Sequence, residues 1–192
     1  MKEKILFLGL STGGPAHINR IFSKIKKLNC HIIIAQHMKE DVINFFVKDL
    51  SSSFSNLDIT TIPVTLNHKK KVVVCGKNAY IADVTNRLIS INCKDNRGKF
   101  TPDIDILFLS AVDAKISQFY RVYAALMTGI GDDGAAGLLK LKENGATTIA
   151  ESEDSAPVFG MPRCAIEIGA ADYVLSLDEM ISFFVQEGLI YV

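Results

Sequence analysis

Short, almost uninterrupted apolar runs alternate along this chain with segments of helical length, and this alternation restricts the fold more than any other feature. Residues 5–9 and 31–35 are such runs, and residues 15–27 and 40–50 after them carry apolar side chains at helical spacing. Strands that are apolar throughout are typical of a parallel sheet covered by helices on both faces. The sequence therefore predicts an α/β fold with a doubly wound, mostly parallel sheet.

The same alternation continues to the end of the chain and predicts a single domain over residues 1–192. Residues 51–55 form a polar break, residues 58–63 a weaker strand, and residues 94–99 a polar loop. Residues 71–91 contain several short apolar runs with Gly and Asn between them, which predicts a small antiparallel hairpin insert. The remaining predicted elements are strands at residues 120–127, 146–150 and 173–175 and helices at residues 103–115, 134–144, 161–168 and 177–187.

Composition excludes several classes of protein. Lysine plus arginine and aspartate plus glutamate each number 21, so no global field attracts nucleic acid or an anionic membrane surface. The first apolar run is too short for a signal peptide or a membrane span. The four cysteines show no Cys-x-x-Cys pair and no spacing typical of metal ligands. We therefore expect reduced, mostly buried thiols, no metal and a cytoplasmic protein.

A serine follows the first predicted strand in a glycine-rich turn. In parallel sheets, ligands bind beyond the carboxyl ends of the strands. Gly9-x-Ser11-x-Gly13 has the G-x-S-x-G form and lies between a strand and a helix, as a nucleophile turn requires. The alternative is that Ser11 only caps the helix that follows.

A histidine follows the second predicted strand, at the same expected edge of the sheet as Ser11. His37 differs from the other three histidines, because His17 lies inside the first predicted helix, His31 begins the second strand and His68 lies in a polar loop. An imidazole at this edge could accept the hydroxyl proton of Ser11 near neutral pH. A purely structural histidine remains the alternative.

The strand at residues 120–127 ends in a loop with two possible functions. Gly129-x-Gly131-x-x-Gly134, with Glu151 about 20 residues further on, matches a dinucleotide-binding fingerprint. Asp132 and Asp133 oppose that interpretation, because two carboxylates at a helix N-terminus disfavour a bound pyrophosphate. An ionised aspartate there would instead orient a histidine, or would cap the helix.

Serine, histidine and aspartate at three strand ends suggest a catalytic triad. The chain order Ser…His…Asp differs from the Ser…Asp…His order of the α/β-hydrolase fold, so the scaffold must be another one. These residues resemble the bacterial chemotaxis receptor methylesterases (CheB type). The matching stretches run in order from about residue 5 to residue 178: Gly9–Pro15, Gln36–Met38, Ala79–Ala82, Asp105–Phe108, Thr128–Gly137, Val158–Arg163 and Gly169–Asp172.

The resemblance implies a role for each matching position. Ser11 corresponds to the nucleophile of the family, His37 to the base, and Asp133, rather than Asp132, to the acid of the triad. The positions that line the substrate and oxyanion site of the family are here Thr12, Gly13, Ile130 and Gly131.

The resemblance also implies an activity: hydrolysis of glutamate γ-methyl esters on the cytoplasmic helices of methyl-accepting chemoreceptors. It leaves open deamidation of the matching glutamines, implies no cofactor, and places the chain at the membrane only through its receptors. A nucleotide-binding protein that uses residues 129–134 and an inactive remnant that only binds receptor are the competing functions.

The chain departs from the family pattern at several points. Ile130 replaces a usual Met, Thr101-Pro-Asp103 replaces Arg-Pro-Ser, and Asp83-Val-Thr85 replaces Pro-Gly-Asp. The first strand begins near residue 5, so we expect no N-terminal receiver domain. Control by a separate regulator in trans remains open.

Overall fold

The main sheet has seven strands, all paired in parallel, in the order β11-β10-β9-β1-β3-β6-β4. The computed structural model describes residues 2–85, 88–93 and 100–192. The predicted polar loop at residues 94–99 lies outside the described residues. The strands are β1 (Glu3–Leu10), β3 (Cys30–Gln36), β4 (Ile59–Thr61), β6 (Val72–Cys75), β9 (Tyr120–Leu126), β10 (Thr147–Glu151) and β11 (Tyr173–Leu175).

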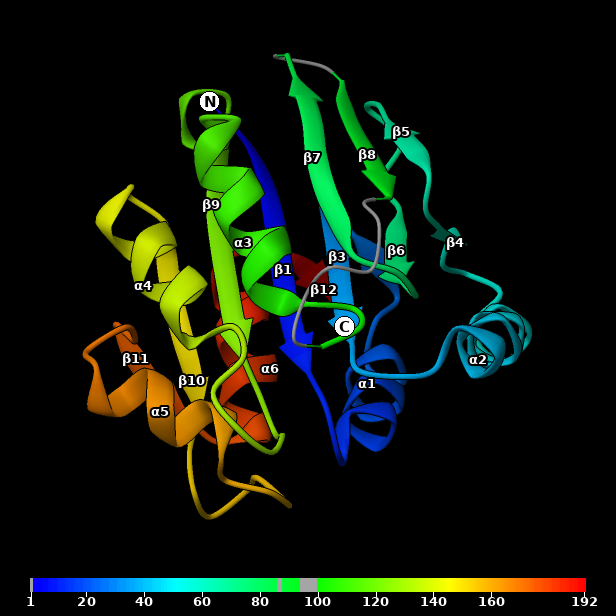
Figure 1. The fold of residues 1–192 in the computed structure, drawn as a ribbon. Helices are drawn as coiled ribbons and strands as arrows, with labels where there is room; N and C mark the ends of the chain where they lie inside the picture. Colours follow the sequence, from blue (N-terminus) through cyan, green and yellow to red (C-terminus); the bar gives the residue numbers. More distant parts are fainter. Residues whose placement is uncertain (1, 86–87, 94–99) are drawn as a thin grey trace.

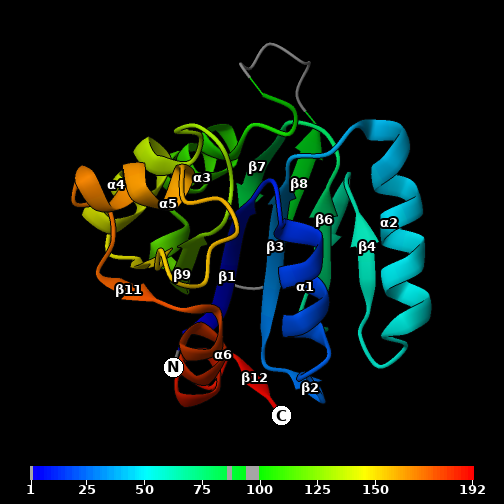
Figure 2. The same cartoon turned by 90° about the horizontal axis from the view of Figure 1, so that it is seen from below.

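Helices cover both faces of this sheet, which confirms the doubly wound α/β fold (Figures 1 and 2). Side chains alternate along β1, so Ile5 and Phe7 belong to one buried cluster and Leu6 and Leu8 to the other. Apolar side chains thus cover most of both faces of the sheet, which explains the apolar runs in the sequence. The first face carries α3 (Ile104–Asp113), α4 (Ala135–Glu143) and α5 (Met161–Glu167), and the second α1 (Gly14–Phe22), α2 (Glu40–Ser53) and α6 (Leu177–Gln186).

The predicted small antiparallel insert is confirmed, but it is made of other strands than predicted. Residues Val72–Cys75 form β6, which lies inside the main sheet between β3 and β4, because all four side chains are apolar and fully buried. The insert is a three-stranded antiparallel sheet of β5 (Val64–Leu66), β8 (Ile89–Cys93) and β7 (Ala79–Val84). It packs against α3, where the Ile81 N–H donates to Ser110 Oγ at 2.9 Å.

Three smaller expectations also need correction. Helix α1 ends at Phe22, and β2 (Lys27–Leu28) then pairs with β12 (Ile190–Tyr191). Helix α2 runs through the predicted polar break, because the hydroxyls of Ser51 and Ser52 donate to carbonyls four residues earlier and need no solvent. Of the four free cysteines, Cys30 and Cys75 are buried and the other two are partly exposed.

The direction of the strands brings the predicted site residues together. The strand order reverses between β1 and β9, and at such a point the loops beyond the carboxyl ends open a crevice. In the register of the sheet, Leu10 of β1 lies beside Gln36 of β3, and Gly9 lies beside Leu126 of β9. Ser11, His37 and the loop after β9 therefore leave the sheet at one level. Among the described residues, no helix is long and apolar enough to cross a membrane.

Candidate active site

Ser11, His37 and Asp133 form one hydrogen-bonded row at the carboxyl edge of the main sheet. His37 Nδ1 lies 3.1 Å from Ser11 Oγ, and His37 Nε2 lies 2.6 Å from Asp133 Oδ2. A carboxylate only accepts hydrogen bonds, so the network assigns the imidazole proton to Nε2. Nδ1 is then left with a free lone pair that faces the serine hydroxyl. This tautomer is the one that a general base requires.

Asp133 joins this row to the start of a helix distant in sequence. Its carboxylate is 3 % exposed, and it accepts the N–H groups of Ile104 at 2.9 Å and of Asp105 at 3.1 Å. These are the first amides of α3, where the helix dipole favours negative charge. Asp133 therefore caps a helix, but this helix is α3 and not the one that follows it in the sequence. Helix α4, which follows Asp133, has Gly134 at its N-cap, and its Gly137 N–H donates to the Asp105 carboxylate at 2.6 Å.

Asp132 lies outside the row. Asp132 is exposed and, together with Asp133, lines a cavity of about 410 Å³. Asp103 and Asp105 line the same cavity. Burial raises the pKa of Asp103 and of Asp105 above the usual value, and the neighbouring Asp133 carboxylate adds to both increases.

The turn that carries Ser11 is held by backbone bonds on both sides. The Ser11 N–H donates to the carbonyl of Thr128 at 2.9 Å, and the Ser11 carbonyl accepts the Gly14 N–H at 2.9 Å. Gly13 is the N-cap of α1 with a φ of 89°, which only glycine adopts without strain, and α1 has no side-chain cap. The alternative that Ser11 merely caps this helix is therefore wrong.

The positions expected around the oxyanion surround this turn. In the part of the chain that the structure describes, the N–H groups of Thr12, Gly13, Ile130 and Gly131 donate to no protein acceptor. Ile130 is 66 % exposed, so its side chain is not part of the protein core.

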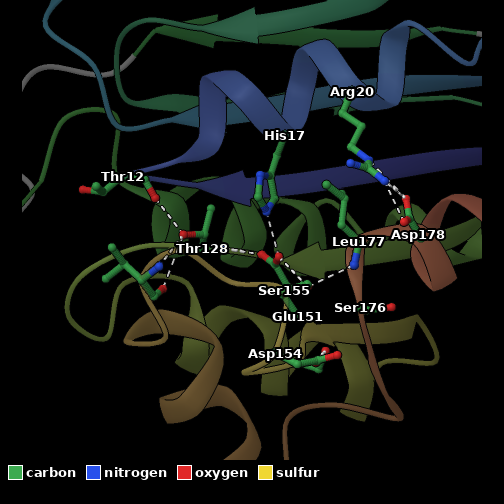
Figure 3. Close-up of polar contacts among 12 residues, drawn as sticks. Thr12, His17, Arg20, Thr128, Glu151, Asp154, Ser155, Ser176, Leu177 and Asp178 are labelled. Carbon is green, nitrogen blue, oxygen red and sulfur yellow. Dashed lines mark hydrogen bonds and ion pairs between the residues drawn. The ribbon is translucent and has the colours of Figure 1, made fainter.

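Glu151, the acid of the dinucleotide fingerprint, is fully buried and has its oxygens occupied. It receives hydrogen bonds from His17 Nε2 at 2.7 Å, from the Thr128 N–H at 2.8 Å and from the Ser155 hydroxyl at 2.8 Å (Figure 3). A carboxylate in this position cannot reach a ribose. The loop after β9 therefore does not form the expected dinucleotide site.

Several residues of the site were missed by the sequence analysis. Phe100 stacks on the His37 ring, with centroids 5.1 Å apart and planes 16° apart, and holds its orientation. Gly129 lies against Ser11, because a Cβ added there would come within 2.6 Å of Ser11 Cβ. Gln36 and Thr128 contact the nucleophile turn directly. The available signal was a polar side chain directly after a run of apolar residues, because Gln36 follows residues 32–35 and Thr128 follows residues 122–127.

Comparison with known proteins identifies the family of this chain. The CheB methylesterase family model matches residues 6–184. A protein-glutamate methylesterase/protein-glutamine glutaminase of Borreliella burgdorferi is 35 % identical over 181 residues, which are 92 % of this chain and 46 % of that protein. Its counterpart in Pyrococcus abyssi is 34 % identical over 186 residues, 90 % of this chain and 47 % of that protein. The chain thus spans about half the length of the curated relatives it matches.

A solved structure gives the same result for the fold. The crystal structure of the Thermotoga maritima CheB methylesterase catalytic domain superposes with a TM-score of 0.79 at 26 % identity, and covers 97 % of this chain and 99 % of that one. A match by the family model over nearly the whole chain, together with relatives above 30 % identity, shows the family. The chain belongs to the CheB methylesterase family.

Proposed function

We propose that this chain hydrolyses glutamate γ-methyl esters of chemoreceptors, with Ser11 as nucleophile, His37 as general base and Asp133 as the acid that orients His37. The observation that carries the proposal is the row from Ser11 Oγ to His37 Nδ1 at 3.1 Å and from His37 Nε2 to Asp133 Oδ2 at 2.6 Å. The names of the relatives, protein-glutamate methylesterase/protein-glutamine glutaminase, support the substrate class.

The first half of the reaction forms an acyl-enzyme. Ser11 Oγ bonds to the ester carbonyl carbon while its proton passes to His37 Nδ1. The Asp133 carboxylate, which accepts two amides of α3, stabilises the imidazolium that results. The carbonyl oxygen becomes an oxyanion, for which the unused N–H groups of Thr12, Gly13, Ile130 and Gly131 are the available donors. The bond to the methoxy oxygen then breaks, and that oxygen takes the proton from Nδ1 and leaves as methanol.

Water completes the cycle through the same groups. It adds to the acyl carbon and gives a proton to His37 Nδ1, and Ser11 Oγ then leaves with that proton. The product is a free glutamate. A glutamine side chain follows the same steps with ammonia as the leaving molecule, so the deamidation named for the relatives needs no further catalytic group.

The proposed substrate lies on the cytoplasmic helices of methyl-accepting chemoreceptors, and the chain would act in the cytoplasm and reach the membrane only through them. The test is release of methanol from methylated receptor fragments by the purified chain. Methanol release by the wild type and none by Ser11→Ala is the expected result. An unchanged rate in Ser11→Ala would end the serine mechanism.

A further inference from the structure

Two side chains hold the backbone carbonyl groups of Ser11 and Thr12. The amide Nε2 of Gln36 donates to the Ser11 carbonyl at 2.9 Å, and the hydroxyl of Thr128 donates to the Thr12 carbonyl at 2.7 Å. Neither side chain has a hydrogen bond to Ser11 Oγ, to the His37 ring or to the Asp133 carboxylate among the described residues. Their contacts nevertheless fix the orientation of two successive peptide planes at the centre of the site.

The orientation of these planes determines where their N–H groups point. Among the described residues, cis peptide bonds occur only before Pro63 and Pro102, so the peptides after Ser11 and Thr12 are trans. In a trans peptide the C=O and the N–H point in opposite directions. A carbonyl held in the protein interior therefore turns the N–H of the next residue outward. The amides concerned belong to Thr12 and Gly13, and both lack a protein acceptor in the described part of the chain.

Thr128 is itself held by a buried network, which Figure 3 shows. Its N–H donates to Glu151 Oε2 at 2.8 Å, its hydroxyl accepts the Val158 N–H at 3.1 Å, and its carbonyl accepts the Ser11 N–H at 2.9 Å. Glu151 is in turn bound by His17 of α1, the helix that begins directly after the nucleophile turn. The turn is thus connected to one buried carboxylate from both of its ends.

Gln36 connects the nucleophile with the base. Its side-chain nitrogen donates to the Ser11 carbonyl at 2.9 Å and to the His37 carbonyl at 3.1 Å. Gln36 is 1 % exposed, and its side-chain oxygen has no hydrogen-bond partner among the described residues. A buried amide that satisfies only its donors is costly if its function is stability alone. The residue therefore serves the two carbonyls that it holds.

We propose that Thr128 and Gln36 are positioning residues that aim the N–H groups of Thr12 and Gly13 at the oxyanion. This inference rests on the proposed function of Ser11. Donors that are already oriented stabilise the charge without rearrangement during the reaction, which is the largest single contribution in many hydrolases. Loss of either side chain should lower kcat and leave KM nearly unchanged, because the oxyanion exists only in the transition state.

The chain offers a matched control for Thr128. Thr148 is equally buried, and its hydroxyl donates to the Ala170 carbonyl at 2.7 Å and accepts the Asp172 N–H at 3.1 Å. Thr128→Val and Thr148→Val remove the same hydroxyl from the same kind of site, but only the first lies at the nucleophile turn. We expect a similar loss of stability in both. We expect kcat to fall roughly 10- to 100-fold in Thr128→Val only.

The assay is the hydrolysis of p-nitrophenyl acetate and of methylated receptor, with kcat and KM measured separately. Thr128→Ser keeps the hydroxyl and should stay within about threefold of the wild-type kcat. Gln36→Met keeps the shape without the donors and should lower kcat as Thr128→Val does; it also decides the question if Thr128→Val does not fold. Wild-type kcat in folded Thr128→Val or Gln36→Met would overturn the proposal. Activity that is retained in the Ser11→Ala variant would instead overturn the proposed function.

Discussion

Replacement of Asp133 by asparagine should separate the two roles that the structure gives this carboxylate. Oδ2 accepts from His37 Nε2 and from the Ile104 N–H, and Oδ1 accepts from the Asp105 N–H. Asparagine has the same shape but only one acceptor oxygen. If its NH₂ occupies the Oδ2 position, His37 must move its proton to Nδ1 and can no longer accept one from Ser11. If its NH₂ faces Asp105, the imidazolium has only a neutral partner.

The magnitude follows from either geometry. Opposite unit charges about 4 Å apart attract by about 4 kcal/mol at an effective dielectric of 20, and their loss in the transition state slows turnover roughly 10³-fold. A wrong tautomer costs about 10⁴-fold in a Ser-His-Asp enzyme. We therefore expect kcat of Asp133→Asn to fall by about 10³- to 10⁴-fold. One amide of α3 also loses its acceptor, which should lower the free energy of unfolding by about 1–2 kcal/mol.

The neighbouring Asp132 provides the control. Its side chain is exposed and lies outside the hydrogen-bonded row, so Asp132→Asn should change kcat less than about threefold. Methanol release gives the rates, and urea denaturation followed by circular dichroism gives the stability. An inactive Asp132→Asn beside an active Asp133→Asn would reverse the assignment of the acid. If Asp133→Asn lowered the free energy of unfolding as expected but left kcat unchanged, Asp133 would have only the role of a helix cap.

The remaining predictions concern the triad, acid stability, the turn and metals. Ser11→Ala and His37→Ala should each abolish methanol release with folding intact, and the double variant should be no worse, because the residues act as a unit; additive losses would contradict this. Burial lowers the pKa of His31 to about 4, so the unfolded chain takes up its proton first as the pH falls. The contribution of His31 to the free energy of unfolding should be complete above pH 6.5 and about 3 kcal/mol smaller at pH 4, as measured by urea denaturation. A His31→Gln variant should lack this dependence on pH. Gly129→Ala should lower kcat at least tenfold, because its Cβ would lie 2.6 Å from Ser11 Cβ; a wild-type rate would show that the turn can move. EDTA should leave the rate of methanol release unchanged, and a loss restored by zinc would refute a metal-free mechanism.

Strand-end reasoning could predict where Ser11 and His37 lie, because both follow strands whose apolar runs are clear in the sequence. The register of β1 and β3 places the preceding residues, Leu10 and Gln36, side by side. The same reasoning could not separate a catalytic Asp133 from a helix cap. That distinction depends on α3, whose first amides reach the carboxylate from nearly 30 residues earlier in the chain. The resemblance supplied the assignment, and the residues alone did not.

Errors in the predicted elements have a common cause in tertiary context. The pattern of residues 71–91 is compatible with a hairpin, and the four apolar residues of β6 alone cannot indicate which sheet they join. Their position beside β3 is decided by burial on both faces, which an edge hairpin would not provide. In the same way, Ser51 and Ser52 are typical of a break, but their hydroxyls bond within α2 and the helix continues.

Thr128 and Thr148 show why positioning residues are harder still to predict. Each is a fully buried threonine, and each hydroxyl donates to a carbonyl at 2.7 Å and accepts an N–H at 3.1 Å. Residue type, burial and the lengths of these two hydrogen bonds are therefore the same, although the Thr148 hydroxyl also lies 3.0 Å from the Asp172 carboxylate. What differs is the carbonyl that receives the bond, because Thr12 follows the nucleophile and Ala170 lies in the turn before β11. A functional difference between two such residues must therefore arise from the peptide plane that each one orients.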